Sequence, residues 1–274
     1  MVEAVLRAVG PYSLRLTSRT ATWSARLPDG RWAAAQQLPD GRVVIRASCE
    51  TGVDEARFML AVDDDTSEFH RLHARDPLIG PAAQRLRGMR PRRKATVTHA
   101  VVRAVSGQLI QASRALEIER AIIRAAGEDP PTRASVARLS PARLTGCGLT
   151  ASRAATLTRL TRSLDLEGLR ARPDALERLG RERGVGPWTV GVIALQGFGR
   201  YDAGLVDDLG LVKLLASLRR RWPEPGETAE LLEPYGEWQG LASMFLLQGF
   251  KRGLVRGASM DRARTVRRPA RTAA

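Results

Sequence analysis

Cysteine is scarce in this sequence, since only Cys49 and Cys147 occur among its 274 residues. Two cysteines so far apart predict neither a disulfide framework nor a metal site, and they are typical of a reducing compartment. We therefore expect no metal among the functional residues and a cytoplasmic protein.

Long apolar runs are also missing. No stretch is long enough to span a bilayer, and residues 1–7 do not form a basic start followed by a long apolar segment. The sequence therefore predicts neither a membrane segment nor a signal peptide. Aromatic residues make up only 5% of the chain, so each is a candidate for the core. Among them we expect Trp238 and Phe245 to be buried.

Acidic residues are outnumbered, with 29 Asp and Glu against 44 Lys and Arg and a net charge of +15. Such a balance favours a polyanionic partner, although a solvated arginine-rich surface would have the same composition. Eight basic residues and one acidic residue lie between Lys251 and the end of the chain. We predict that residues 256–274 form a basic, disordered tail.

The first fifty residues have the turns and strand formers of a β-sheet. Two Pro-Asp-Gly turns, at residues 28–30 and 39–41, lie within residues 11–48, and a β-branched run follows at residues 43–45. Alternation over Tyr12–Leu16 predicts a further strand. We expect a small antiparallel meander here, followed by two helices, over residues 51–61 and 67–74.

Three consecutive aspartates, Asp63-Asp64-Asp65, separate those two helices. Side chains of consecutive residues point in different directions, which disfavours a shared metal ion. We interpret the run as a solvated loop that caps the second helix, and keep a metal site as the alternative.

Helical periodicity is continuous from residue 91. The expected helices cover residues 96–106, a segment ending at 126, and residues 135–139, 141–144, 151–164, 173–180, 188–197, 208–221, 228–232 and 239–254. Gly107 interrupts the pattern and predicts a bend. The chain is therefore predicted to be an α+β protein, with an α/β domain that contains an antiparallel sheet over residues 1–90 and a helical domain over residues 91–255.

A glycine turn leads into one of these helices. It reads Gly184-Val185-Gly186-Pro187-Trp188-Thr189. Glycine allows positive φ and close approach of the backbone to a ligand, and proline suits the first helical position. Free N–H groups at such a helix start suit a phosphate. A tight turn without a ligand is the structural alternative.

A carboxylate follows 22 residues after Gly186. Asp208 opens the apolar segment Asp208-Leu209-Gly210-Leu211. An aspartate in this place is also a common helix N-cap. Asp207 is the adjacent rival, but neighbouring side chains at a helix start diverge by about 100°, so we expect one of the two to face a ligand.

The turn and the carboxylate, in this order and spacing, resemble the helix-hairpin-helix DNA glycosylases, and within them the 3-methyladenine DNA glycosylase II branch. The resemblance extends loosely over residues 11–253 and implies a mainly helical helix-hairpin-helix glycosylase fold with the α/β domain in front. It implies that Asp208 is catalytic and that Trp188 lines the base pocket. The DNA-binding residues that it implies are Gly184, Val185, Gly186, Thr189, Gln108 and Leu109, the last of them inserted into the duplex.

Further expectations follow from the resemblance. The partner is double-stranded DNA with damaged bases, the protein is a monomer associated with the nucleoid, and no cofactor is required apart from a monovalent cation on the hairpin carbonyls. Trp188 occupies the position at which strand-cleaving relatives have a lysine nucleophile, so a monofunctional enzyme is expected. There is no cysteine cluster for the iron–sulfur module of some relatives.

The sequence also departs from the family pattern. Glu182 and Arg183 precede the glycine turn where an apolar residue is usual, and Val192 and Leu247 stand at usually aromatic positions. Two alternatives therefore stay open at this point. One is a non-catalytic helix-hairpin-helix DNA-binding protein in which Asp208 only caps a helix, and the other is a glycosylase for oxidised or mismatched bases.

Overall fold

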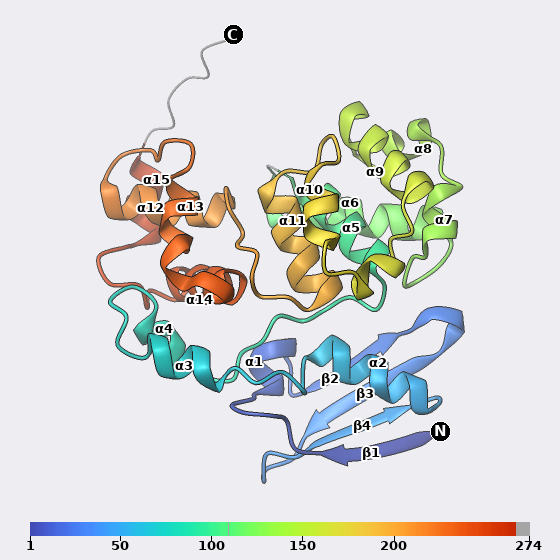
Figure 1. Cartoon of the computed structure of the whole chain (residues 1–274), viewed down its shortest axis with the longest axis horizontal. Helices are drawn as coiled ribbons and strands as arrows, with labels where there is room; N and C mark the ends of the chain where they lie inside the picture. The colour runs from blue at the N-terminus through green and yellow to red at the C-terminus, as the bar shows by residue number, and fades with distance from the viewer. Residues whose placement is uncertain (109, 267–274) are drawn as a thin grey trace.

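The fold was analysed in a computed structural model that describes residues 1–108 and 110–266. A four-stranded antiparallel sheet of β1 (Val2–Leu6), β2 (Thr22–Arg26), β3 (Trp32–Gln37) and β4 (Val43–Ala47) has the strand order β1-β4-β3-β2. Helix α2 (Glu50–Leu60) packs against β1, β3 and β4 (Figure 1). The predicted meander is confirmed for β2, β3 and β4, whereas β1 lies outside the predicted range.

The two Pro-Asp-Gly sequences form the predicted turns. Between β2 and β3, Asp29 and Gly30 adopt φ values of 62° and 73°. Between β3 and β4, Gly41 adopts a φ of 87°, and the amide of Leu38 donates to the carbonyl of Arg42 at 2.8 Å. The glycines thus take the left-handed conformation that such turns favour.

The strand predicted over Tyr12–Leu16 is wrong, because these residues lead into helix α1 (Leu14–Ser18). Ser13 caps the helix, with its hydroxyl accepting from the amide of Leu16 at 3.3 Å. The buried residues Leu14, Thr17 and Ser18 have helical spacing, whereas the five-residue window of alternation was too short to separate the two periods.

The remaining helices include those that were predicted, with boundaries that shift by a few residues, and two that were not predicted, over residues 80–85 and 260–265. They are α3 (Ser67–His73), α4 (Gly80–Arg85), α5 (Val97–Gly107), α6 (Ala112–Ala126), α7 (Arg133–Ala137), α8 (Pro141–Gly146), α9 (Ala151–Ser163), α10 (Ala175–Gly180), α11 (Pro187–Ile193), α12 (Leu209–Arg219), α13 (Glu227–Leu232), α14 (Gln239–Lys251) and α15 (Met260–Thr265). A π-helical turn, η3 (Ala194–Phe198), extends α11. Within the described residues no helix has both the length and the apolarity needed to cross a bilayer.

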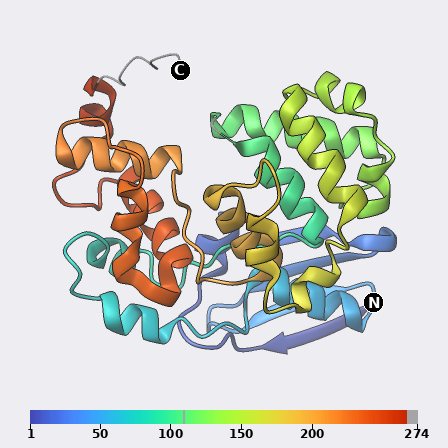
Figure 2. The ribbon, with the colours of Figure 1, turned by 45° about the horizontal axis from the view of Figure 1, so that its top comes forward.

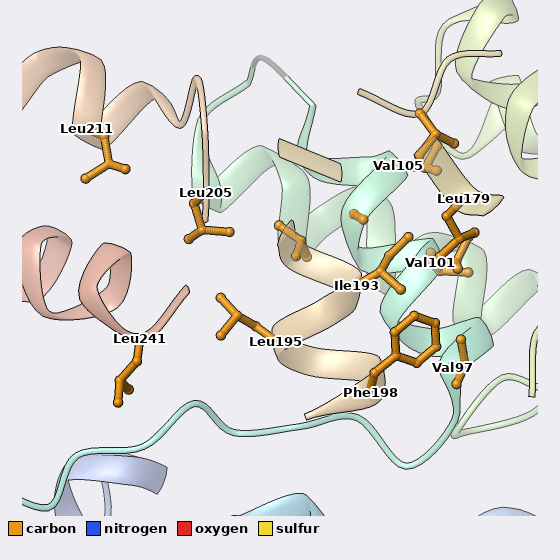
Figure 3. Close-up of a cluster of buried hydrophobic side chains, with 14 of the residues drawn as sticks. Val97, Val101, Val105, Leu179, Ile193, Leu195, Phe198, Leu205, Leu211 and Leu241 are labelled. Carbon is orange, nitrogen blue, oxygen red and sulfur yellow. The ribbon is translucent and has the colours of Figure 1, made fainter. Parts of the chain in front are cut away.

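Two groups of helices stand side by side, the first over the sheet and the second over the segment of α3 and α4 (Figures 1 and 2). One contains α5 to α11 and the other contains α12 to α15, and the segment from Gly199 to Asp208 crosses between them. Their apolar side chains form one continuous core, in which Ile193 and Leu195 lie on one side and Leu205, Leu211 and Leu241 on the other (Figure 3). The crossing segment therefore joins two halves that pack on each other.

A second core fills the space between the sheet and α2. Helices α3 and α4 precede the predicted domain boundary at residue 90, yet Phe69 and Ile79 are buried in the helical core and α4 packs on α14. Phe245 is fully buried beside Phe69, with ring centroids 5.1 Å apart, and Trp238 is packed between Phe69 and Tyr201. The sequence prediction of a core residue is confirmed for Phe245, whereas Trp238 is partly buried and packs against the core.

The prediction of a disordered tail from residue 256 is wrong for residues 260–265, which form α15. Ser259 caps this helix, Ala263 is buried, and the amide of Ser259 donates to the hydroxyl of Ser217 on α12 at 2.8 Å. A few apolar and hydroxyl contacts thus order a segment whose composition is strongly basic. Residues 267–274 lie outside the described residues.

Candidate active site and DNA interface

Asp208 stands at the first turn of α12 with both carboxylate oxygens engaged. Oδ1 accepts from the amide of Gly210 at 2.7 Å, and Oδ2 accepts from the indole Nε1 of Trp188 at 2.8 Å. The side chain is half-buried. The helix N-terminus and the two donors stabilise the negative charge and hold the carboxylate in one orientation.

Asp207 points elsewhere. Its backbone takes a left-handed φ of 62°, and its side chain and amide both pair with Thr228 of α13. The hydroxyl of Thr228 donates to Asp207 Oδ1 at 3.0 Å, and the amide of Asp207 donates to that hydroxyl at 2.9 Å. The two adjacent aspartates therefore diverge, and only Asp208 contacts Trp188.

The glycine turn forms the hairpin between α10 and α11. Gly184 has a φ of 81°, and a side chain there would collide with Thr156 of α9. Gly186 occupies the N-cap position of α11 without a side-chain cap, and Pro187 is the first helical residue. The start of α11 therefore presents backbone amides rather than a capping side chain.

The two residues that depart from the family pattern have partners on α9. Arg159 forms an ion pair with Glu182, with Nε and Oε2 3.3 Å apart, and it also donates to the carbonyl of Arg183. A polar clamp thus supports the turn where apolar packing was expected, so the turn itself is retained.

The bend after α5 contacts the hairpin directly. The amide nitrogen of Gln108 donates to the carbonyl of Gly184 at 2.9 Å and to the hydroxyl of Thr189 at 3.0 Å. Leu109, the predicted wedge, lies outside the described residues. A Cβ at Gly107 would lie 2.7 Å from Cη2 of Trp188, so the glycine that interrupts the helix lets the indole approach. The bend, the hairpin and Trp188 are therefore contiguous.

The two positions that are usually aromatic differ in location. Leu247 on α14 packs so closely on Gly210 that any side chain at Gly210 would collide with it, which places Leu247 next to the first turn of α12. Val192 is buried in the helical core, with 6% of its surface exposed. Leu247 therefore lies beside the helix start that contains Asp208.

The acidic run Asp63-Asp64-Asp65 contains one largely buried aspartate that the sequence did not reveal. Asp65 accepts from the amide of Ser67 at 2.8 Å and Asp63 pairs with Arg57, as expected for a capping loop. Asp64, however, is largely buried, where it accepts from the guanidinium of Arg93 and the hydroxyl of Tyr201. Among the described residues there is no group of three or more His, Cys, Asp or Glu side chains with the geometry of a metal site.

This buried contact fixes the start of the crossing segment. Arg93 also donates to the carbonyl of Gly199 at 3.1 Å. Burial, followed by the nearby carboxylate of Asp64, raises the pKa of Tyr201, so the phenol stays a neutral donor. No sequence signal identified the trio, because its members are far apart in the chain.

Two grooves lie along the sheet, and neither includes Asp208 or Trp188. Each has a volume of about 530 Å³. Residues of β2 and β3 and Arg92 line both grooves, and the second also includes residues 93–95, His99 and Asp129. The candidate site is therefore defined by its side-chain contacts and not by these grooves.

Comparison with known proteins shows similarity in sequence and in fold. No family model matches the chain. A DNA-3-methyladenine glycosylase from Bacillus subtilis (strain 168) is 27% identical over 232 residues, which cover 77% of this chain and 76% of that protein.

Solved structures show the same fold. The 3-methyladenine DNA glycosylase from Archaeoglobus fulgidus superposes with a TM-score of 0.77 at 17% identity, over 91% of this chain and 98% of that one. An 8-oxoguanine glycosylase/lyase from Clostridium acetobutylicum, in complex with double-stranded DNA, superposes with a TM-score of 0.67 at 19% identity, over 89% and 93% of the two chains. With its hairpin and the aspartate at the start of α12, the chain has the fold of these DNA glycosylases and is similar in sequence to the Bacillus subtilis protein.

Proposed function

We propose that the protein is a monofunctional DNA glycosylase that hydrolyses the N-glycosidic bond of alkylated bases, of the 3-methyladenine type, in base-excision repair. One observation carries the proposal: the Asp208 carboxylate is held by the indole of Trp188 and the first turn of α12, close to the hairpin. The name of the Bacillus subtilis relative supports the same substrate class.

The chemistry requires a fixed negative charge. As the bond between base and sugar breaks, positive charge develops on the deoxyribose, as in glycoside hydrolysis. The Asp208 carboxylate stabilises that charge and orients or deprotonates the attacking water. Because Asp208 is already oriented by Trp188 and Gly210, little reorganisation is needed during the reaction.

The single carboxylate favours a base that is already a good leaving group. Asp207 is bound to Thr228 and is not placed to act as a paired general acid. An alkylated, cationic base leaves without protonation, and a cation also stacks favourably on an indole face. Trp188 can offer such a face to the base while its N–H donates to Asp208, because the residue is half-exposed.

Strand cleavage is not proposed. A glycosylase with lyase activity needs an amine nucleophile that forms a Schiff base. Here the residue two positions after Gly186 is Trp188, whose nitrogen donates to Asp208. The reaction therefore ends at the abasic site, which also separates this chain from glycosylase/lyases that act on oxidised bases.

Duplex DNA is the proposed partner. The turn of Gly184, Val185 and Gly186 is proposed to bind a backbone phosphate through the amides of Gly184 and Gly186, with Thr189 one turn behind them. The amide of Val185 instead donates to the carbonyl of Glu182 at 3.0 Å. The basic surface adds affinity that does not depend on sequence. We also propose that the protein acts as a monomer on chromosomal DNA in the cytoplasm. Sedimentation of the free protein at micromolar concentration tests whether it is a monomer.

A cation at the hairpin is not needed for this proposal. The carbonyl oxygens of Glu182, Arg183 and Gly184 already accept hydrogen bonds from Val185, Arg159 and Gln108. Each of these carbonyl oxygens keeps a second lone pair that could face a monovalent cation, and no step of the reaction is assigned to such an ion.

The second candidate is a DNA-binding protein without catalysis. It is favoured by one observation, the hydrogen bond from Gly210 that makes Asp208 an N-cap. Incubation with methylated duplex DNA, followed by chromatography of the released bases, separates the two candidates. Free 3-methyladenine supports the glycosylase, and tight binding without any released base supports the binding protein.

A further inference from the structure

Gln108 joins two parts of the surface that is proposed to bind DNA. It directly follows α5, yet its side-chain nitrogen donates to the carbonyl of Gly184 and the hydroxyl of Thr189. A primary amide nitrogen has two N–H donors, and these two bonds use both of them. Only the carbonyl oxygen of this side chain is left to contact a ligand.

One face of α9 holds the same two parts together from the other side. Arg153 donates to the backbone carbonyl of Gln108, Thr156 packs under Gly184, and Arg159 donates to the carbonyl of Arg183. These three residues are spaced by three, so they lie on one face of the helix. The bend and the hairpin are therefore fixed to each other through α9 as well as through Gln108.

We propose that Gln108 is a positioning residue that sets the hairpin relative to the bend, and does not itself read a base. To donate to DNA, its amide would have to break hydrogen bonds that it already makes within the protein. By keeping those bonds, Gln108 makes the hairpin and the bend engage the duplex as one unit. This inference rests on the proposed role of the hairpin in binding DNA.

A double-mutant cycle on duplex affinity tests the inference. Gln108→Met keeps the length of the side chain and removes both donors, and Thr189→Val keeps the shape and removes one acceptor. Each variant should weaken binding to undamaged duplex about five- to tenfold, as expected for the loss of one or two hydrogen bonds. The double variant should be no weaker than the weaker-binding single variant, because both changes remove the same interaction.

Effects that multiply in the double variant would overturn the inference, since Gln108 and Thr189 would then contact DNA independently. Gln36→Met makes the same chemical change on β3, far from the hairpin, and should leave the affinity unchanged. Thermal unfolding of all variants shows whether the fold is retained.

A measurement without DNA keeps the inference separate from the proposed function. Hydrogen exchange of the hairpin amides should be faster in Gln108→Met than in the wild-type protein, because the turn loses its bond at the carbonyl of Gly184. Unchanged exchange at residues 182–188 would contradict the positioning role. If exchange rises but Gly186→Asp leaves duplex affinity unchanged, the positioning role stands and the hairpin is not the phosphate site.

Discussion

Two helix starts lie side by side in the candidate site, and they are completed in opposite ways. At the start of α11, Gly186 offers no capping side chain, so backbone amides remain for an anion. At the start of α12, the Asp208 carboxylate caps the helix and also accepts from Trp188. The first arrangement suits a phosphate and the second suits a developing cation. Binding and chemistry should therefore be separable by mutation.

The largest effect is expected from Asp208→Ala, which removes both the charge and the cap. The excision rate should fall by about a hundredfold or more, as for the loss of one preorganised electrostatic group. The protein should also lose about 1 kcal/mol of folding stability with the cap. Single-turnover excision and urea denaturation measure the two losses. A rate within threefold of wild type would remove Asp208 from the chemistry.

Gly186→Asp is expected to act on binding alone. Nothing lies within 4 Å of a Cβ built on Gly186, so a side chain fits, but a carboxylate there would repel a phosphate. Affinity for any duplex should fall about tenfold, with excision unchanged at saturating enzyme. Gly186→Ala is the matched neutral control and should bind nearly as wild type. Equal losses in both variants would indicate a steric effect.

Trp188→Phe tests the link between the two helix starts. Phenylalanine keeps an aromatic ring at this position and removes the N–H that holds Asp208. A hydrogen bond to a charged group contributes about 1.5–3 kcal/mol, so single-turnover excision should slow about tenfold or more. Duplex affinity should stay near the wild-type value. If duplex affinity fell and the excision rate did not, Trp188 would contribute to DNA binding and not to orienting Asp208.

The smallest effect is expected from removing residues 267–274. A truncation at residue 256 would also delete α15, which packs on α12. A loss of affinity could then come from a loss of folding stability. The shorter cut removes three arginines, Arg267, Arg268 and Arg271, and should make the salt dependence of binding less steep, since fewer counterions are released. The excision rate at saturating enzyme should not change. A steeper salt dependence would contradict the electrostatic role.

The sequence identified those parts of the site whose structure is determined locally. The Gly-x-Gly-Pro turn and the aspartate before an apolar run were readable because caps and turns depend on a few adjacent residues. For the same reason the two Pro-Asp-Gly turns were predicted correctly. The apolar alternation over Tyr12–Leu16 fits a strand as well as a helix. The cap at Ser13 and the burial of Leu14 stabilise the helix.

Contacts between distant segments were not readable. Asp64 was interpreted as solvated, but Arg93 and Tyr201 bury it and join the N-terminal region to the crossing segment. Likewise, no pattern in the sequence showed that Gln108 would bond to the hairpin or that Leu247 would pack on Gly210. These contacts depend on packing in three dimensions, which residue spacing along a single sequence does not specify.

The central claim is that the charge of Asp208, and not its cap, drives base excision. The most direct test compares Asp208→Asn with Asp207→Asn in single-turnover excision of 3-methyladenine at saturating enzyme. Asparagine caps about as well as aspartate and tolerates the left-handed backbone at residue 207. We predict a loss of about a hundredfold or more for Asp208→Asn, with duplex binding retained, and near wild-type excision for Asp207→Asn. Wild-type excision by Asp208→Asn would contradict the account and favour the non-catalytic DNA-binding protein.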